Sequence, residues 1–404
     1  LDPDSTGITK GYFNKIKGND IKLPGTLDEA GYGTKTKGAD YGILTRKYKY
    51  VGPAWYQREF EVPQDWKNKN VTLLLERVMW QSQVWIDGKQ FDIQEGLGTP
   101  HYHTLLKLKP GKHTITVRVN NDMIYNIGDK GHSYGEYTQI IWNGMLGKIE
   151  LEAQPEVALS NVQVWPNHAK KQLTVNFASN NGKNKVKLPV TFKLIDKQTN
   201  EVVNTTTQTI VLAANQAQHS QTIAINKDVK TWSEFSPNVY ALEVSWNYGK
   251  STGAQTVDFG FRNVGASKSK VLINNTAVYM RGNLDCLHFP LTGYPSTDVK
   301  EWERIFKIYK SYGLNQVRFH SWCPPEAAFV AADKLGIYIM AEVLWIDWWM
   351  SVVRAERPEM TTKGLPKGMG YNASADAFVP AEMQRMLDAY SNHPSFVFMC
   401  IGNE

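Results

Sequence analysis

Residues 315–343 have the sequence NQVRFHSWCPPEAAFVAADKLGIYIMAEV, and this stretch decides the fold. Its two ends, NQVRFH and IYIMAEV, are short and largely apolar, which predicts two buried strands. The segment between them begins with proline and ends with Gly336, the residue types that most often open and close a helix. Two consecutive strands joined by a helix run parallel, and such a sheet is covered by helices. The stretch therefore predicts an α/β unit.

The same alternation continues on both sides of this unit. Upstream, VLINNTAVYMRG (residues 271–282) predicts a strand, and DVKEWERIFKIYKSYG (residues 298–313) predicts a helix. Downstream, AEMQRMLDAYSNH (residues 381–393) predicts a helix and PSFVFMCIGNE (residues 394–404) a strand. The sum is four strands with three helices between them. We therefore expect the first half of a (β/α)8 TIM barrel over residues 263–404.

Two regions of β pattern precede this half-barrel. From about residue 53 to residue 154, runs such as VTLLLERV and HTITVRV alternate apolar and polar residues and are separated by turns such as Asp87-Gly88, which predicts a sandwich or jelly roll as the domain of residues 1–154. About seven short strands in residues 155–262 predict an immunoglobulin-like β-sandwich. The expected fold class is thus a multidomain β and α/β protein.

The composition excludes several classes of protein. The formal charge of +6 is spread thinly, so no nucleic-acid surface is expected. No run of about 18 apolar residues offers a membrane span. The cysteines Cys286, Cys323 and Cys400 have no regular spacing, which argues against a disulfide framework and against a zinc site. The chain begins at Leu1 with no visible signal peptide, so we expect a processed product that is secreted or periplasmic.

Polar residues lie where each predicted barrel strand ends. In a parallel barrel these ends meet at one rim, where functional groups are found. Any single one of them could simply cap a strand or pair with a neighbour. Four consecutive strands that end in this way indicate a pocket able to bind hydroxyl groups and move protons. The residues are Arg281 and Asn283 on the first strand, Arg318 and His320 on the second, Glu342 on the third, and Asn403 and Glu404 on the fourth.

The last stretch, NHPSFVFMCIGNE (residues 392–404), is similar to the acid/base signature of glycoside hydrolase family 2, which includes β-galactosidases, β-glucuronidases and β-mannosidases. The resemblance extends over nearly the whole chain and implies a sugar-binding jelly roll, an immunoglobulin-like sandwich and a TIM barrel, in this order. Further stretches that carry it are PAWYQREFEVP, SQVWIDGKQ, WNGMLGKIEL, DFGFR, RGN and ADKLGIYIMAE.

The resemblance implies roles for three of the rim residues. Glu404 is expected to be the general acid/base, which protonates the glycosidic oxygen and later activates water. Asn403 is expected to bind the sugar 2-hydroxyl. Glu342 is expected to bind substrate or a cation, and an ion pair with Arg318 is an alternative of equal weight.

The chain also departs from the family pattern. Cys286 occupies the first-strand position where the family commonly has a histidine, and His288 follows two residues later. The loop LWIDWWMSVVR, which includes Trp345, is expected to form an aromatic wall. Arg281, Asn283, His288, Arg318, His320 and Trp345 are expected to bind substrate. No residue is assigned as a metal ligand and no cofactor is required; a Mg²⁺ or Na⁺ ion is expected only from the resemblance.

The expected function is that of an exo-acting retaining β-glycosidase that hydrolyses a terminal β-linked sugar, first of all a β-galactoside. The expected substrate is an oligo- or polysaccharide. A homo-oligomer is a further expectation. A retaining enzyme needs a nucleophilic carboxylate, which the family places on the seventh barrel strand, so we expect it outside this chain. Glu342 is a less favoured substitute. The alternatives are a β-uronidase of the same family, because Arg281, Arg318 and His320 could meet a carboxylate, or a non-catalytic carbohydrate-binding protein.

Overall fold

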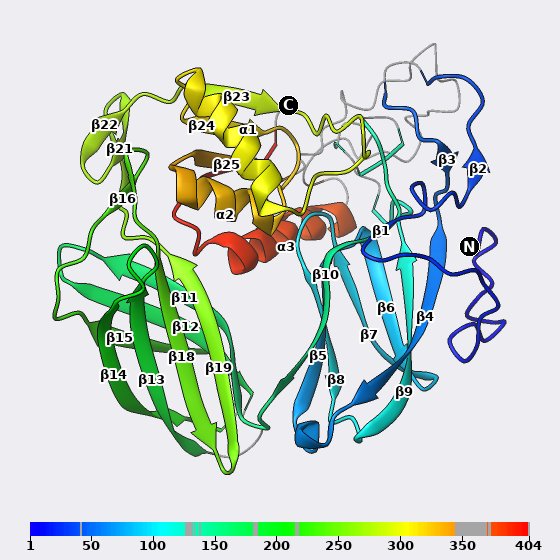
Figure 1. Cartoon of the computed structure of the whole chain (residues 1–404), viewed down its shortest axis with the longest axis horizontal. Coiled ribbons are helices and arrows are strands. Elements are labelled where there is room, and N and C mark those ends of the chain that lie inside the picture. The colour runs from blue at the N-terminus through cyan, green and yellow to red at the C-terminus, as the bar shows by residue number, and fades with distance from the viewer. Residues whose placement is uncertain are drawn as a thin grey trace.

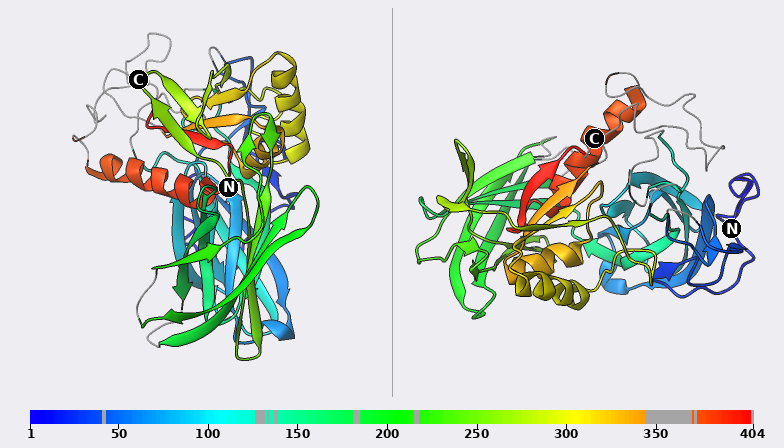
Figure 2. Two further views of the ribbon diagram at one scale, coloured as in Figure 1. Left: turned by 90° about the vertical axis from the view of Figure 1, so that its left-hand side faces the viewer. Right: turned by 90° about the horizontal axis from the view of Figure 1, so that it is seen from above.

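The computed structural model describes residues 1–40, 43–125, 132, 134–136, 139–180, 185–214, 218–343, 370 and 373–402. Figure 1 shows two β-sandwiches side by side, with a parallel sheet and its helices lying across one end of both. The two further views in Figure 2 show the same layering. The predicted fold class is therefore confirmed.

The first sandwich consists of two four-stranded sheets, with the strand orders β1-β10-β5-β8 and β4-β9-β6-β7. Alternate residues of their strands, such as Val71, Leu73 and Leu75, are buried between the sheets, as the predicted alternation requires. A short pair, β2-β3, and one 3-10 turn (Gln64–Trp66) lie outside these sheets. The strands are β1 Gly25–Thr26, β2 Thr34–Lys35, β3 Tyr48–Lys49, β4 Pro53–Val62, β5 Asn70–Arg77, β6 Trp80–Ile86, β7 Lys89–Gly96, β8 His101–Leu106, β9 Gly111–Asn120 and β10 Gly144–Gln154.

The second sandwich pairs a three-stranded sheet, β11-β12-β15, with a four-stranded sheet, β14-β13-β18-β19. Its core includes Phe177, Phe192 and Trp246, and the Trp246 indole donates to the Val157 carbonyl over 3.0 Å. Seven strands in two sheets agree with the immunoglobulin-like prediction. The strands are β11 Ala158–Asn167, β12 Gln172–Asn180, β13 Val186–Asp196, β14 Val202–Leu212, β15 Gln218–Ala224, β18 Tyr240–Tyr248 and β19 Ser251–Phe259, with the short pair β16 Trp232–Ser233 and β17 Ser236–Pro237 beside them.

The third part is a parallel sheet with the order β23-β24-β25-β26. Asp298 caps the first helix by accepting from the Lys300 N–H, and Gly336 closes the second with a φ of 70°. The third helix begins at Ala373, before the predicted start at residue 381, and Pro380 lies inside it. The elements are β23 Gly282–Asp285, α1 Val299–Ser311, β24 Gln316–Phe319, α2 Glu326–Leu335, β25 Tyr338–Glu342, α3 Ala373–Tyr390 and β26 Phe396–Cys400.

The predicted first barrel strand over residues 271–282 is wrong. Asn274 and Asn275 have φ values of 51° and 66°, which is the left-handed conformation of a tight hairpin turn. The chain therefore folds back into an antiparallel sheet of β20 (Val264–Ser267), β21 (Lys270–Ile273) and β22 (Thr276–Val278). The first parallel strand begins only at Gly282.

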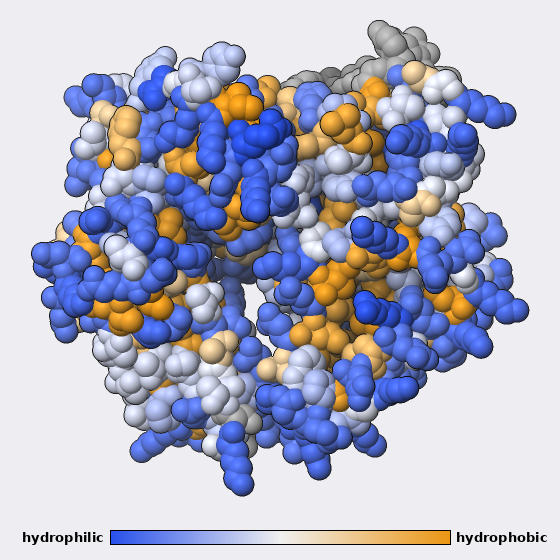
Figure 3. Space-filling view, in the orientation of Figure 1, coloured by the Kyte–Doolittle hydropathy of each residue, from blue (hydrophilic) through white to orange (hydrophobic). Residues whose placement is uncertain are grey.

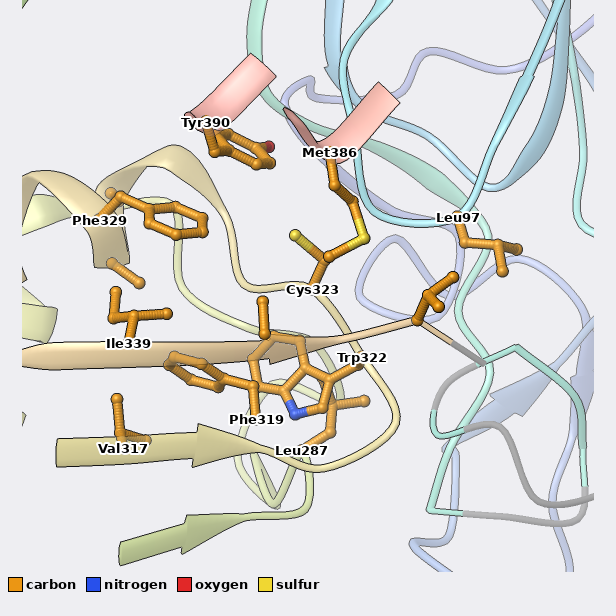
Figure 4. Close-up of a cluster of buried hydrophobic side chains, with 14 of the residues drawn as sticks. Leu97, Leu287, Val317, Phe319, Trp322, Cys323, Phe329, Ile339, Met386 and Tyr390 are labelled. Atoms are coloured by element: carbon orange, nitrogen blue, oxygen red, sulfur yellow. The ribbon is translucent and has the colours of Figure 1, made fainter. Parts of the chain in front are cut away.

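One apolar cluster joins the parallel sheet to the first sandwich. Figure 4 shows Leu97 of the sandwich near Met386 of α3 and Cys323, the latter in the loop after β24. Polar contacts reinforce this junction: an Arg77 Nη atom donates to the Cys323 carbonyl over 2.6 Å, and Glu382 accepts from the Leu97 N–H over 3.0 Å. The rim that follows β24 is thus fixed against the first sandwich.

None of the described helices is long and apolar enough to cross a bilayer. On the face in Figure 3, polar residues cover most of the surface, apolar residues gather over the first sandwich, and the molecule is hollowed between the two sandwiches.

Candidate active site

The carboxyl ends of β23, β24, β25 and β26 lie at one edge of the parallel sheet, because all three pairings are parallel. In such sheets ligands bind at this edge. The chain beyond β26 leads to Asn403 and Glu404, which lie outside the described residues, as does Trp345. The site can therefore be built from the other three strand ends.

Arg318 and Glu342 form an ion pair at this edge. Arg318 Nε donates to Glu342 Oε1 over 2.5 Å, and the Ser321 N–H donates to Oε2 over 2.8 Å. The Glu342 side chain is fully buried, whereas Arg318 keeps 33% of its side chain exposed. Both oxygens of Glu342 are thus engaged in orienting Arg318 and the turn at Ser321, which does not favour Glu342 as a nucleophile.

His320 lies beside His132, which comes from the segment between β9 and β10 of the first sandwich. The two imidazole rings are stacked, with centroids 4.6 Å apart. Burial, and after it the neighbouring His320 and His288, lower the pKa of His132 to about 3. His132 is therefore neutral at physiological pH, and the first sandwich contributes a side chain to the edge of the parallel sheet.

Asp285 ends the first parallel strand, and Cys286 follows it directly. Burial raises the pKa of the Cys286 thiol; the Asp285 charge raises it further, and Arg318 acts in the opposite direction. Burial also raises the pKa of Asp285. The Leu287 N–H donates a hydrogen bond to the Asp285 carboxylate over 2.8 Å, which acts to lower this pKa. A carboxyl group whose pKa is raised in this way can hold or release a proton near a bound ligand.

Asp285, Cys286 and His132 were not predicted as site residues. Recognising Asn274-Asn275 as a turn would have moved the first strand forward and placed Asp285 and Cys286 at its carboxyl end. His132 carries no comparable signal, because it follows β9 in a different sandwich and is brought in only by the packing of the two parts.

Two predicted site residues do not lie where they were expected. Arg281 precedes β23, at the opposite edge of the sheet, and its guanidinium donates to the Gly313 carbonyl over 2.6 Å. Asn283 lies inside β23 and donates to the Tyr309 hydroxyl of α1 over 2.8 Å, so it faces the covering helix. The expectation that Arg281 and Asn283 end a strand at the rim is wrong, for the reason given for residues 271–282. His288 is exposed and lies just beyond β23.

The NHPS stretch has a structural role on the other side of β26. His393 Nδ1 lies 2.6 Å from an Asp333 carboxylate oxygen, and Nε2 lies 3.2 Å from Glu326. Burial alone would lower the pKa of His393, but Glu326 and Asp333 raise it well above its usual value. Asp333 also accepts from the Ser395 N–H over 2.9 Å. These contacts fix the start of β26 against α2.

The described residues at this edge offer few free oxygen ligands for the Mg²⁺ ion expected from the family resemblance. Mg²⁺ prefers oxygen ligands, and both oxygens of Glu342 already accept hydrogen bonds. The one group of three close metal-binding side chains found in that part of the chain consists of two imidazoles and a thiol. The Mg²⁺ or Na⁺ ion stays an expectation from the resemblance, and the reaction proposed below assigns no step to it.

Two family models match the chain. Residues 157–262 match "Glycosyl hydrolases family 2", and residues 264–404 match "Glycosyl hydrolases family 2, TIM barrel domain". The chain belongs to glycosyl hydrolase family 2. The predicted domain limits at residues 154 and 262 stay a prediction.

The chain is also similar to individual members of this family. It is 24% identical to a putative β-glucuronidase of Formosa agariphila over 91% of this chain and 33% of that protein. It is 23% identical to a β-galactosidase of Thermoanaerobacterium thermosulfurigenes over 76% of this chain and 44% of that protein. The structure of a β-glucuronidase from Ruminococcus gnavus in complex with D-glucaro 1,5-lactone superimposes with a TM-score of 0.73 and 19% identity, over all of this chain and 64% of that one. The chain thus spans less than half the length of these two curated relatives, and the structural likeness shows the fold.

Proposed function

We propose that this chain is part of an exo-acting retaining β-glycosidase in which Glu404 is the general acid/base. The observation that carries the proposal is the family 2 barrel segment, in which β26 ends at the edge where Arg318 and Glu342 form their ion pair, and the sequence continues within four residues to Asn403-Glu404. An enzyme of this class has its reacting groups at that edge.

The proposed reaction has two steps. Glu404 protonates the glycosidic oxygen while a second carboxylate, about 5–5.5 Å away, attacks the anomeric carbon; the aglycone leaves and a covalent glycosyl-enzyme forms. Glu404, now a carboxylate, removes a proton from a water molecule whose oxygen attacks the anomeric carbon; the bond to the second carboxylate breaks, and the sugar leaves with retained configuration. Asn403 binds the 2-hydroxyl, and Arg318, oriented by Glu342, binds another oxygen of the sugar ring.

A terminal β-galactoside is the substrate proposed first, and a β-uronide is the second candidate. Both kinds of name occur among similar relatives at almost equal identity. The argument for a uronide needed Arg281, Arg318 and His320 to meet a carboxylate. Arg281 lies at the opposite edge of the sheet, and Arg318 is already paired with Glu342. Of the three residues in that argument, only Arg318 and His320 lie at the rim, so the described residues give the uronide less support than the sequence suggested.

Glu404→Gln tests the acid/base role in the protein as its source makes it. Its kcat should fall on the order of 10²–10⁴-fold on a substrate with a poor leaving group, whose departure depends on protonation, and far less on an activated aryl β-glycoside. Glu303→Gln, which changes a partly buried carboxylate on α1 outside the candidate site, is the matched control and should keep wild-type turnover. Wild-type turnover of Glu404→Gln on the poor leaving group would refute the assigned role.

The sugar is tested by comparing kcat/KM for aryl β-galactoside and aryl β-glucuronide. Faster hydrolysis of the galactoside supports the first proposal, and faster hydrolysis of the glucuronide supports the second. Tight sugar binding without hydrolysis of either substrate would point instead to a carbohydrate-binding protein.

A further inference from the structure

Three side chains able to bind a transition metal meet at the edge of the parallel sheet. His132 comes from the first sandwich, Cys286 follows β23, and His320 follows β24. One ligand atom of each lies within 4.8 Å of the other two. No motif in the sequence indicates this group, and the prediction against zinc rested on the spacing of the cysteines alone.

The ligand atoms are available. His132 is buried, and its Nδ1 has no hydrogen-bond partner within the part of the chain that the structure describes. His320 Nδ1 lies 3.2 Å from the Ser321 hydroxyl, which holds this ring by one nitrogen and leaves Nε2 for a metal. Cys286 is not in a disulfide. A buried imidazole nitrogen without a partner is costly, so a ligand for it is expected.

The donor set selects the kind of metal. Two imidazoles and a thiolate suit Zn²⁺, whereas Mg²⁺ and Ca²⁺ require oxygen ligands. Tetrahedral zinc with bonds of about 2.0–2.3 Å separates its ligand atoms by about 3.3–3.7 Å. The ligand atoms are now up to 4.8 Å apart, so metal binding requires them to approach by about 1 Å. Rotation of the two stacked imidazole rings out of their parallel arrangement would bring their nitrogen atoms closer together.

We propose that His132, Cys286 and His320 form a zinc site whose fourth position is open to water or to a hydroxyl group of a bound molecule. Three protein ligands with one open position are the arrangement that zinc has where it binds exchangeable ligands. Because His132 belongs to the first sandwich, the metal also ties that sandwich to the barrel rim. The proposal does not rest on the glycosidase activity.

Metal titration of the full chain tests this site. After treatment with a chelator and its removal, the protein is titrated with Zn²⁺ against a chromophoric competitor, and in parallel with Co²⁺ to record the near-ultraviolet absorption of a cobalt–thiolate bond. We expect one Zn²⁺ per chain, a Kd below about 1 μM, and the cobalt–thiolate band. Cys286→Ser should abolish the band and weaken Zn²⁺ binding at least about tenfold, and His132→Asn should weaken it similarly.

Cys400→Ser is the matched control, because Cys400 is a partly buried free thiol at the end of β26, near the same rim but outside the cluster. It should bind both metals as the wild type does. Absence of the cobalt–thiolate band in the wild type would overturn the proposal whatever the variants do. A band that survives in Cys286→Ser would also overturn it. Far-ultraviolet circular dichroism of each variant ensures that only folded proteins are compared.

Discussion

Asn392 Oδ1 accepts a hydrogen bond from the Val164 backbone N–H over 2.8 Å, although 228 positions separate these residues in the chain. The same side chain donates to the Val162 carbonyl over 3.0 Å. Val162 and Val164 belong to β11 of the second sandwich, and Asn392 immediately precedes the buried His393. The NHPS stretch therefore links three parts of the fold: α2, β26 and the second sandwich.

Asn392→Ala should uncouple the second sandwich from the barrel segment. The change leaves the Val164 backbone N–H and the Val162 backbone carbonyl without their partner, which lowers the free energy of unfolding by about 1–3 kcal/mol. Differential scanning calorimetry should show a lower melting temperature and a broader or split transition. Asn167→Ala is the control, because Asn167 lies at the end of the same strand but caps an exposed turn. Equal effects of the two substitutions would contradict the linking role.

His393 should make the protein less stable as the pH rises. Its folded-state pKa is raised, so the stability that its protonation adds is complete below the unfolded value of about 6.5 and is lost as the pH rises toward the folded value. Denaturant unfolding between pH 6 and pH 9 should show this decline, with a slope of up to about 1.4 kcal/mol per pH unit. His393→Gln should be less stable at pH 6 and should show a flatter curve. An unchanged slope in this variant would exclude His393 as the source.

The parts of the fold that the sequence predicted correctly are those with strong local signals. The strand around Ile339 is mostly apolar and buried, the strand around Val317 buries its apolar residues Val317 and Phe319, and Gly336 closes the helix between the two strands. The first barrel strand was missed because Asn274 and Asn275 lie within an apolar run whose overall hydrophobicity resembles that of one strand. The group of His132, Cys286 and His320 depends on how the first sandwich packs against the barrel, and no local pattern encodes that packing.

Glu342→Gln should destabilise the rim. The substitution removes the charge that pairs with Arg318 and replaces one acceptor oxygen of a fully buried side chain by a donor. Removing one partner of a fully buried ion pair costs on the order of 3 kcal/mol, and we expect a smaller loss here because Arg318 keeps 33% of its side chain exposed. Urea unfolding monitored by tryptophan fluorescence should show this as a lower midpoint. Glu301→Gln removes the partner of Arg304 in an exposed pair on α1 and should leave the midpoint almost unchanged. Similar shifts for both variants would mean that the Arg318 pair behaves as a surface contact.

Two buried histidines in the first sandwich should make the protein sensitive to acid. Ser82 Oγ lies 2.7 Å from His101 Nδ1 and 2.8 Å from His103 Nε2, and His103 also contacts Asp92. Burial, and after it the neighbouring His103, lower the pKa of His101 to about 3, and burial also lowers the pKa of His103. Both rings are therefore neutral in the folded protein at pH values where the unfolded chain already binds protons.

The sign of this effect is opposite to that of His393. A histidine with a lowered folded-state pKa destabilises the folded protein in acid. The unfolding free energy decreases as the pH falls from about 6.5 toward about 3, because over this range only the unfolded chain takes up the proton. His101→Gln keeps an amide that can bond to Ser82 but removes the titrating ring. Unfolding measured between pH 4 and pH 7 should show a smaller loss of stability in this variant than in the wild type. If the two curves run parallel over that range, the acid sensitivity arises elsewhere in the molecule.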